Sequence, residues 1–406
     1  MLYYEWKKIW VRPGTKIAML LLAGLLMIVG FFAIRDVYYV NENGDHEYGP
    51  AAISKLKAAK KEWAGELTEE VIAEVIAENR RINETKEGRS EEIRESNIAY
   101  GWKQGFHDIR HMLMYAFCKF RSSDYYRPDS LVPEDAVHFY ENRVGNLKEW
   151  LAEEEQQYLF SEEEREFLIA RYEALEIPWQ YDYEDGFIEF FYYAATVVMI
   201  MFLILGFVVA PVFSGEFAYK AEAVFYASYH GRGKAVGAKL AAAFLFVTTV
   251  YFGVMLLYSI IVFGFLGADG AGLMIQISRD GWKSFYLLTN WQEYLLIVCG
   301  GYVGVLFGLL LTMLVSAKTK STALSVIVPF ALLFIPSFLG SRISRKIIAL
   351  LPDRLMDIHQ SLVTFNLYSI GGRIVGAIGI LFCIYSVLSL VLFPLTYQVY
   401  RKLEVK

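Results

Sequence analysis

The chain has 406 residues, of which 55% are hydrophobic, with a mean hydropathy of +0.33 and a formal net charge of −5. This composition is too apolar for an ordinary soluble protein and too rich in charge for a chain made only of membrane helices. The charge is concentrated in residues 35–187, which hold 19 Lys or Arg and 34 Asp or Glu, whereas the rest of the chain holds 20 and 10. An acidic polar segment therefore interrupts a basic, apolar chain.

The N-terminus predicts a membrane anchor. Four apolar residues recur there at helical spacing: Leu2, Trp6, Ile9 and Trp10. They predict a cytoplasmic interfacial helix within residues 1–16, the alternative being an irregular tail. Residues 17–34 form an apolar run that just suffices to cross ~30 Å of hydrocarbon. A signal peptide is the competing interpretation, but residues 32–34 lack the small-x-small cleavage pattern.

The polar segment, residues 35–187, predicts a mostly helical extracytoplasmic domain. Asn43-Gly44 is typical of a hairpin turn. Thr68 is placed to cap a helix, and Ser161 with Glu164 forms a capping-box pattern before another. Further helices are expected over residues 98–120 and 134–153. About 150 residues suffice to bury a core, and we expect this segment to fold on its own. Its one cysteine, Cys118, excludes a disulfide within it.

Five further apolar runs follow the polar segment, each long enough or nearly long enough to cross a membrane. They are Phe187–Phe213, Leu240–Leu266, Tyr294–Val315, Thr322–Leu339 and Ile374–Tyr397. Together with residues 17–34 they predict an all-α membrane protein with six transmembrane helices. Residues 188–406 would form a five-helix transmembrane domain, and the segment at 341–373 would lie along the membrane or dip into it.

The distribution of basic residues predicts the orientation of these helices. With the N-terminus inside, the cytoplasmic pieces hold 13 Lys or Arg and are residues 1–16, 214–239, 316–321 and 398–406. The outer loops 267–290 and 341–373 hold two and five, and the latter number weakens the bias. The positive-inside rule places both termini in the cytoplasm and the polar segment outside. We expect a multi-pass protein of the plasma membrane.

Nucleotide-binding and metal-binding motifs are poorly supported. Gly231-Arg232-Gly233-Lys234 lacks the upstream glycine and the following Ser or Thr of a phosphate-binding loop. His107 and His111 share one helix face at a spacing that suits zinc, but no further ligand is specified, and a solvated helix face is the default interpretation. We therefore expect no cofactor, no metal and no enzymatic activity in this chain, and no nucleic-acid partner.

The fourth apolar run carries a stripe of glycines. Gly300, Gly304 and Gly308 recur every four residues, which lets another helix approach closely. Gly372 and Gly376 form a second such pair. Helix packing is the expected role of both sets, with a flexible hinge as the alternative.

The loop between the second and third apolar runs, residues 214–239, predicts a short amphipathic helix, a glycine-rich turn and a basic return to the membrane. An acid directly after a membrane helix, a short helix, and then Gly-Arg and Lys resemble the permeases of the ABC type-2 exporter family. In that family this loop is the coupling helix that docks on the ATPase. The resemblance assigns six residues to the ATPase-coupling region: Glu216, Glu222, Tyr229, Arg232, Lys234 and Lys239. Ordinary interfacial charges are the alternative interpretation.

The resemblance implies a permease subunit of an ATP-driven ABC transporter that exports a hydrophobic or amphipathic compound or peptide. Its partners would be separate ABC ATPase subunits, which bind ATP and magnesium, a second permease subunit, identical or paralogous, and the lipid bilayer. Two alternatives stay open. A membrane sensor would use the polar segment to bind a ligand, but the chain has no cytosolic output domain. A mechanically acting FtsX-like permease also has a large outer domain, but normally four membrane helices.

Overall fold

The structure is a computed structural model, and it describes residues 1–229, 231, 233–339 and 344–402. Within these ranges six helical spans are long and apolar enough to cross a membrane. They are α2 (Pro13–Asp36), the continuous pair α10 (Asp185–Val209) and α11 (Pro211–Ala218), α13 (Lys234–Leu266), α14 (Asn290–Thr319), α15 (Thr322–Leu339) and α19 (Ala377–Arg401). The six predicted spans are confirmed by length and composition, and the chain is a multi-pass, mostly helical protein.

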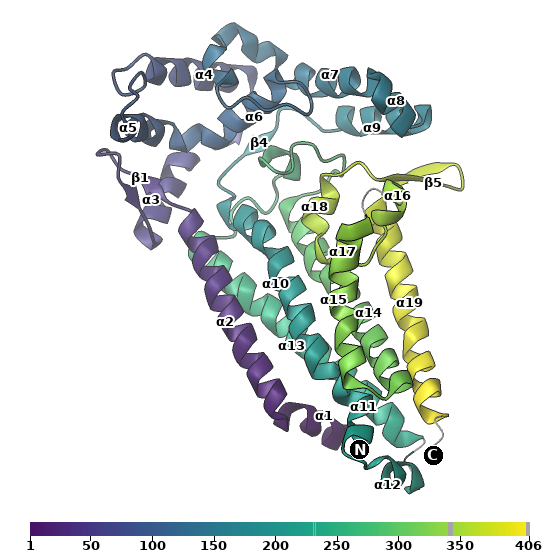
Figure 1. The fold of residues 1–406 in the computed structure, drawn as a ribbon. Coiled ribbons are helices and arrows are strands. Elements are labelled where there is room, and N and C mark those ends of the chain that lie inside the picture. Colours follow the sequence, from purple (N-terminus) through teal and green to yellow (C-terminus); the bar gives the residue numbers. More distant parts are fainter. Residues whose placement is uncertain (230, 232, 340–343, 403–406) are drawn as a thin grey trace.

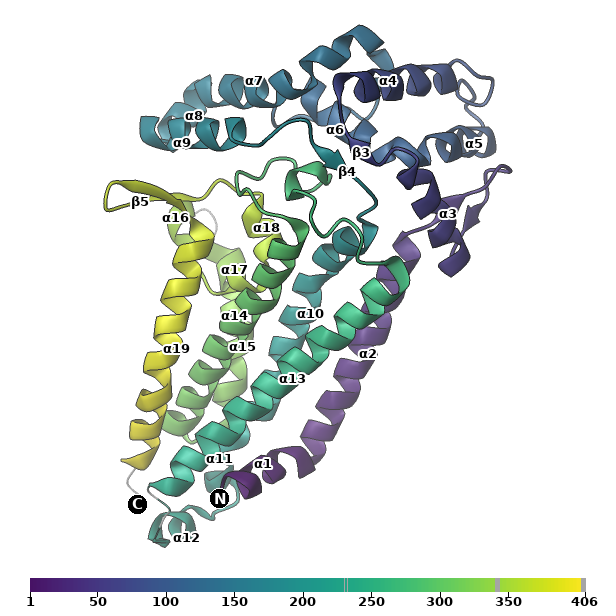
Figure 2. The same ribbon diagram turned by 180° about the vertical axis from the view of Figure 1, so that it is seen from behind.

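The six spans form a bundle with two different ends (Figure 1). The N-terminus and the last described residues of α19 lie at one end, here called the termini end, beside α1 (Leu2–Val11) and α12 (Glu222–Ala227). The other end, here called the layer end, is covered by a helical layer made of residues 37–184, here called the polar layer. Figure 2 shows the same division from behind.

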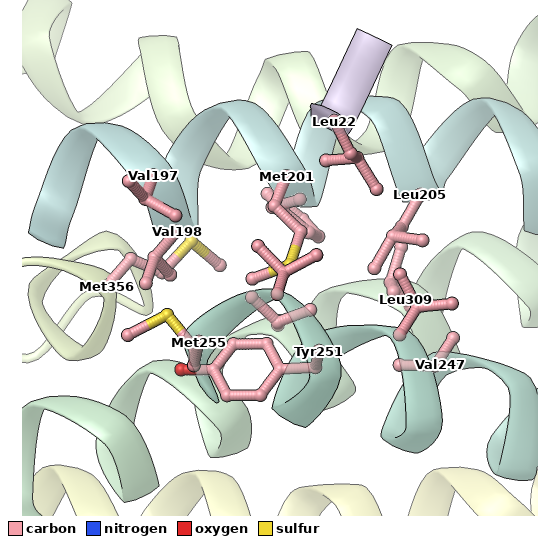
Figure 3. Packing of buried hydrophobic residues seen from close by; sticks show 14 of the residues in the cluster. Leu22, Val197, Val198, Met201, Leu205, Val247, Tyr251, Met255, Leu309 and Met356 are labelled. Carbon is pink, nitrogen blue, oxygen red and sulfur yellow. The ribbon is translucent and has the colours of Figure 1, made fainter. Parts of the chain in front are cut away.

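Tight contacts between α10 and its neighbours form the core of the bundle. The α10–α11 span has 61% of its apolar stretch buried, whereas α15 has 17%, so α10 is central and α15 peripheral. Figure 3 shows Val198 and Met201 of α10 packed near Tyr251 and Met255 of α13. Because lipid tails are as apolar as these side chains, the bundle depends on close packing more than on exclusion of water.

The polar layer consists of short helices, 3-10 turns and two small antiparallel pairs of strands. Its helices are α3 (Pro50–Lys61), α4 (Glu69–Asn83), α5 (Ile93–Lys103), α6 (His107–Phe117), α7 (Phe139–Ala152), α8 (Glu154–Leu159) and α9 (Glu162–Glu173). The 3-10 turns are η1 (Gln104–Phe106), η2 (Arg127–Ser130) and η3 (Pro133–His138). Antiparallel pairs join β1 (Tyr39–Val40) to β2 (His46–Glu47) and β3 (Gly65–Glu66) to β4 (Gln180–Tyr181).

Several local predictions for the polar layer are confirmed. The hydroxyl of Thr68 accepts a hydrogen bond from the Val71 amide and caps α4. Ser161 and Glu164 form the reciprocal capping box that begins α9. Gly44, in the turn between β1 and β2, has φ +78°, a value that glycine adopts without strain. The two expected long helices are shorter than predicted, because η1 precedes α6 and η3 precedes α7.

Residues from outside the polar layer complete its hydrophobic core. The loop between α13 and α14, residues 267–289, contributes Leu273, Ile277 and Trp282 to one buried cluster of the layer. Its Phe285 joins a second cluster, which also contains Phe365. This loop includes the turn η4 (Ile275–Ile277). The expectation that residues 35–187 fold on their own is therefore not supported, because removing the loop would uncover large apolar side chains.

The segment before the last span, residues 344–376, extends up to Ala377 and not up to the predicted Ile374. It holds three one-turn helices, α16 (Arg345–Ile348), α17 (Asp353–Met356) and α18 (Ile358–Leu362), and a hairpin of β5 (Leu367–Ile370) with β6 (Arg373–Gly376). The last helix begins at Ala377, because residues 373–376 are paired as a strand. Gly372 lies in the hairpin turn with φ +78°, and Gly376 faces the ring of Tyr286. Their predicted role as a helix-packing pair is therefore wrong.

Candidate functional site

The predicted coupling loop forms the tip of the termini end. Glu216 lies on α11, Glu222 begins α12, and Lys239 lies one turn into α13. Lys234 is exposed at the first position of α13. Tyr229 follows α12 and is 96% exposed. Arg232 lies outside the described residues.

Two of the predicted residues meet in a buried ion cluster. Nζ of Lys239 lies 2.6 Å from Oε1 of Glu216 and 3.4 Å from Oε2 of Glu5. Nζ of Lys8 lies 3.4 Å from Glu216 and 3.3 Å from Glu5. The side chain of Lys239 is only 2% exposed, so its charge depends on these two carboxylates. The cluster ties α1 to both α11 and α13.

Aromatic contacts hold α12 against the same end of the bundle. The hydroxyl of Tyr226 donates a hydrogen bond of 3.0 Å to the carbonyl oxygen of Tyr400 on α19. Nζ of Lys239 lies 5.2 Å from the centre of the Phe225 ring, a cation–π contact. The position of α12 is thereby linked to the ion cluster and to the last span. The sequence did not reveal the roles of Glu5, Lys8, Tyr226 or Tyr400.

Exposed apolar side chains lie on α12 at Val224 and on either side of this helix at Tyr219 and Tyr229. Tyr219 is 84% exposed and Val224 is 77% exposed, and Tyr229 lies just beyond them. Lys220 separates α11 from α12 and adopts φ +55°, so the chain turns sharply there. The tip of the molecule, where α12 lies (Figure 1), therefore exposes apolar side chains from α12 and from the residues beside it.

The glycine stripe of α14 contacts three neighbours. A side chain at Gly300 would collide with Ile358 of α18, and one at Gly308 would collide with Phe202 of α10. At Gly304 the nearest atom, Cβ of Leu355 on α17, would be 3.1 Å away. The stripe thus permits close approach along its whole length, and its partners include the short helices of the layer end.

A second buried charge cluster joins the polar layer to the bundle. Nζ of Lys60 on α3 lies 2.8 Å from Asp108 of α6 and 2.6 Å from Asp185 at the start of α10. The hydroxyl of Tyr181 lies 3.1 Å from Asp108 and donates to it. Burial would raise the pKa of Asp108, but the adjacent Lys60 outweighs this and lowers the pKa to about 2. The sequence analysis did not identify this cluster.

The two histidines of the sequence motif lie beside this charge cluster. The rings of His107 and His111 are 4.4 Å apart between centroids. Burial, followed by the neighbouring His111, lowers the pKa of His107 to about 3, so that this ring is neutral near pH 7. Among the described residues no group of three ligands has the geometry of a metal site.

Glu293, an acid in the first turn of α14, is buried at the layer end of the bundle. Its side chain is 3% exposed, and Oε1 lies 2.6 Å from Nδ1 of His359 on α18. Burial lowers the pKa of His359, but the hydrogen bond and the charge of Glu293 outweigh this effect, and the pKa is raised. The pair therefore fastens α18 to the end of α14.

No family model, curated protein or solved structure matches this chain. Its function must therefore be argued from the sequence and from the geometry of the two ends of the bundle.

Proposed function

We propose that this chain is the membrane-spanning permease subunit of an ATP-driven transporter of the ABC type-2 exporter kind. The observation that carries the proposal is the tip of the termini end, where buried charges brace α12 and where Tyr219, Val224 and Tyr229 are exposed. A separate ATPase subunit would dock on this surface. Six spans supply half of a transport pathway, so a second permease subunit would complete it.

The bracing of α12 suits the transmission of movement. Lys239 and Glu216 connect the helices on both sides of the loop, and Glu5 connects them to α1. The contact between Tyr226 and Tyr400 adds the last span. A displacement of α12 by a docked ATPase would therefore reach several spans at once, as a packed network of buried contacts transmits strain.

The proposed orientation follows from the basic residues. Lys7, Lys8, Arg12 and Lys16 precede or begin the first span, and Lys318 and Lys320 end α14 at the same end of the bundle. This excess supports a cytoplasmic position for the termini end. The polar layer then lies outside the cell, and the tip of α12 is within reach of an ATPase. ATP and magnesium would be bound by that partner.

The first test concerns the partner. When the full-length protein is purified from its native membranes, a second protein with a phosphate-binding loop should co-purify with it. ATPase activity should be found in the fractions that contain this second protein, and the isolated chain should have none. Val224→Asp should reduce co-purification at least about tenfold, because a buried charge without a partner opposes docking. Ile93→Asp is the matched control, since Ile93 is 78% exposed on the polar layer.

Two outcomes would contradict the proposal. Robust hydrolysis by the isolated chain would place the ATPase within it. Equal recovery of the partner with Val224→Asp and Ile93→Asp would show that α12 is not the docking surface.

The second test concerns orientation. A cysteine at Ser90, in the loop between α4 and α5, should react with a membrane-impermeant thiol reagent on intact cells. Cys299 and Cys383 are exposed on α14 and α19 and should first be replaced by alanine, whereas Cys118 is buried. Ala223→Cys on α12 is the matched control and should react only after lysis. The reverse pattern would place α12 outside the cell and rule out docking of a cytoplasmic ATPase.

A further inference from the structure

A polar cavity lies where the polar layer meets the bundle. It has a volume of about 420 Å³ and lies between α6, the 267–289 loop, α16 and α18. Four basic side chains line it: Arg121, Arg279, Lys283 and Arg345. Asp280 is the one acid among the described lining residues. The cavity thus carries a formal excess of three positive charges.

Among the described residues, three of these four cations have no acidic partner. Arg279 pairs with its neighbour Asp280 at 3.3 Å. Across the described ranges of the chain, no carboxylate lies within ion-pair distance of Arg121, Lys283 or Arg345. Burial, and then the positive charge of Arg121, lower the pKa of both Lys283 and Arg345. These side chains therefore repel one another.

Two buried cations of the polar layer are paired with acids, whereas the buried Arg143 stacks on the ring of Tyr172 and donates to backbone carbonyl oxygens. Lys60 meets two carboxylates, and Arg110 lies 3.0 Å from Asp129. Two of the three unpaired cations of the cavity likewise lie against aromatic rings. Cζ of Arg121 lies 4.7 Å from the centre of the Trp150 ring, and Nζ of Lys283 lies 5.6 Å from that of Tyr115. Both charges are thus fixed at the cavity without a carboxylate that neutralises them.

We propose that this cavity binds the phosphoryl group of an anionic ligand. A phosphoryl group offers several acceptor oxygens and up to two negative charges, which suit two guanidinium groups and an ammonium group. The volume also leaves room for atoms beyond the phosphoryl group itself.

A neighbouring cavity extends the site toward apolar surface. It has a volume of about 230 Å³ and shares Arg345 and Phe365 with the first. Leu159, Phe160 and Leu367 line it. A phospholipid could place its headgroup among the cations and part of an acyl chain here, whereas a soluble phosphate would use the first cavity alone. The chemistry of the phosphoryl site is the same in both cases.

The bound anion would join three separate segments of the chain. Arg121 follows α6 in the polar layer, Lys283 belongs to the 267–289 loop, and Arg345 begins α16. Removing the repulsion among them would strengthen the contact between the polar layer and the bundle. This inference does not depend on the proposed ATPase partner.

The test uses the full-length chain in a non-ionic detergent and measures its thermal midpoint. Three probes are titrated: inorganic phosphate, a short-chain phosphatidylglycerol, and phosphatidylcholine of the same chain length, each against sodium chloride of equal ionic strength. We expect a saturable rise of the midpoint with phosphatidylglycerol that exceeds the rise with phosphatidylcholine. Arg345→Gln and Lys283→Gln should each weaken this binding about tenfold or more, because a hydrogen bond to a charged group contributes ~1.5–3 kcal/mol.

The thermal midpoint without ligand distinguishes a loss of binding from a general loss of stability in these variants. Without ligand, Arg345→Gln and Lys283→Gln should keep or raise the midpoint, since each removes repulsion. Arg89→Gln is the matched control, because Arg89 is exposed on the same layer outside the cavity, and it should bind as the wild type does.

Each outcome decides the matter. A response to both phosphate and phosphatidylglycerol identifies a site for the phosphoryl group itself, and a response to the lipid alone identifies a headgroup site that needs the apolar cavity. Equal responses to phosphatidylglycerol and phosphatidylcholine would overturn the proposal, and so would no response at all. A response that persists unchanged in both cavity variants would also overturn it.

Discussion

Replacing Lys60 with methionine should lower the stability of the folded protein by about 3–5 kcal/mol, the usual effect of removing one partner from a buried ion pair. The side chain of Lys60 is 6% exposed, and those of Asp108 and Asp185 are 18% and 10% exposed. Methionine has a similar length but no charge, so both carboxylates would stay buried without their cation. The thermal midpoint of the full-length protein in detergent measures the effect.

Two further variants separate the ion cluster from general damage to α3. Lys55→Met removes a lysine of the same helix whose pair with Glu47 is exposed, and it should leave the midpoint nearly unchanged. Adding Asp185→Asn to Lys60→Met removes one of the stranded charges and should recover part of the loss. If Lys60→Met behaved like Lys55→Met, the cluster would not join the polar layer to the bundle.

Features set by neighbouring residues could be predicted from the sequence. The six spans follow from runs of apolar residues, because a helix that crosses lipid must satisfy its backbone within itself. The caps at Thr68 and Ser161 follow from side chains that reach an amide three residues away. The turn at Gly44 follows from the local preference of Asn-Gly.

Features that depend on distant residues could not be predicted. Lys60 and Asp185 are 125 positions apart, and no local pattern indicates that they meet. From the sequence, the 267–289 loop is only a connection between two spans. In the structure its residues Leu273 and Trp282 complete the core of the polar layer. Ile374 continues an apolar run, but its pairing with Ser369 makes it a strand residue and delays the start of α19.

The candidate site could be predicted only in part from the sequence, because its residues are also distant from one another along the chain. Glu216 and Lys239 were selected by their positions in the loop, and the structure brings them together at 2.6 Å. Glu5 and Lys8 could not be assigned to the site from the sequence, because Lys239 and Glu216, which they meet in the cluster, lie more than 200 residues away. The sequence thus identified the loop but not the cluster that braces it.

Replacing Lys239 with methionine should destabilise the termini end by about 3 kcal/mol, at the low end of the range for a broken buried pair because Lys8 stays near Glu216. It should also loosen α12, since the cation–π contact with Phe225 is lost. Under the proposed function, the amount of co-purifying ATPase should fall at least about tenfold together with the thermal midpoint. Lys402→Met, which removes an exposed lysine at the same end, is the control for both measurements.

The double variant Lys239→Met with Glu216→Leu distinguishes stability from coupling. Replacing a buried ion pair by apolar side chains is often neutral or stabilising, so the double variant should regain most of the lost midpoint. The amount of co-purifying ATPase should not recover. The apolar pair makes neither the ion pair with Glu5 on α1 nor the cation–π contact with Phe225 on α12, so the two helices are no longer held in place relative to each other. If the double variant regained both stability and the ATPase, the cluster would serve only to hold the termini end together, and the transmission of movement would have to run through Tyr226 and Tyr400 instead.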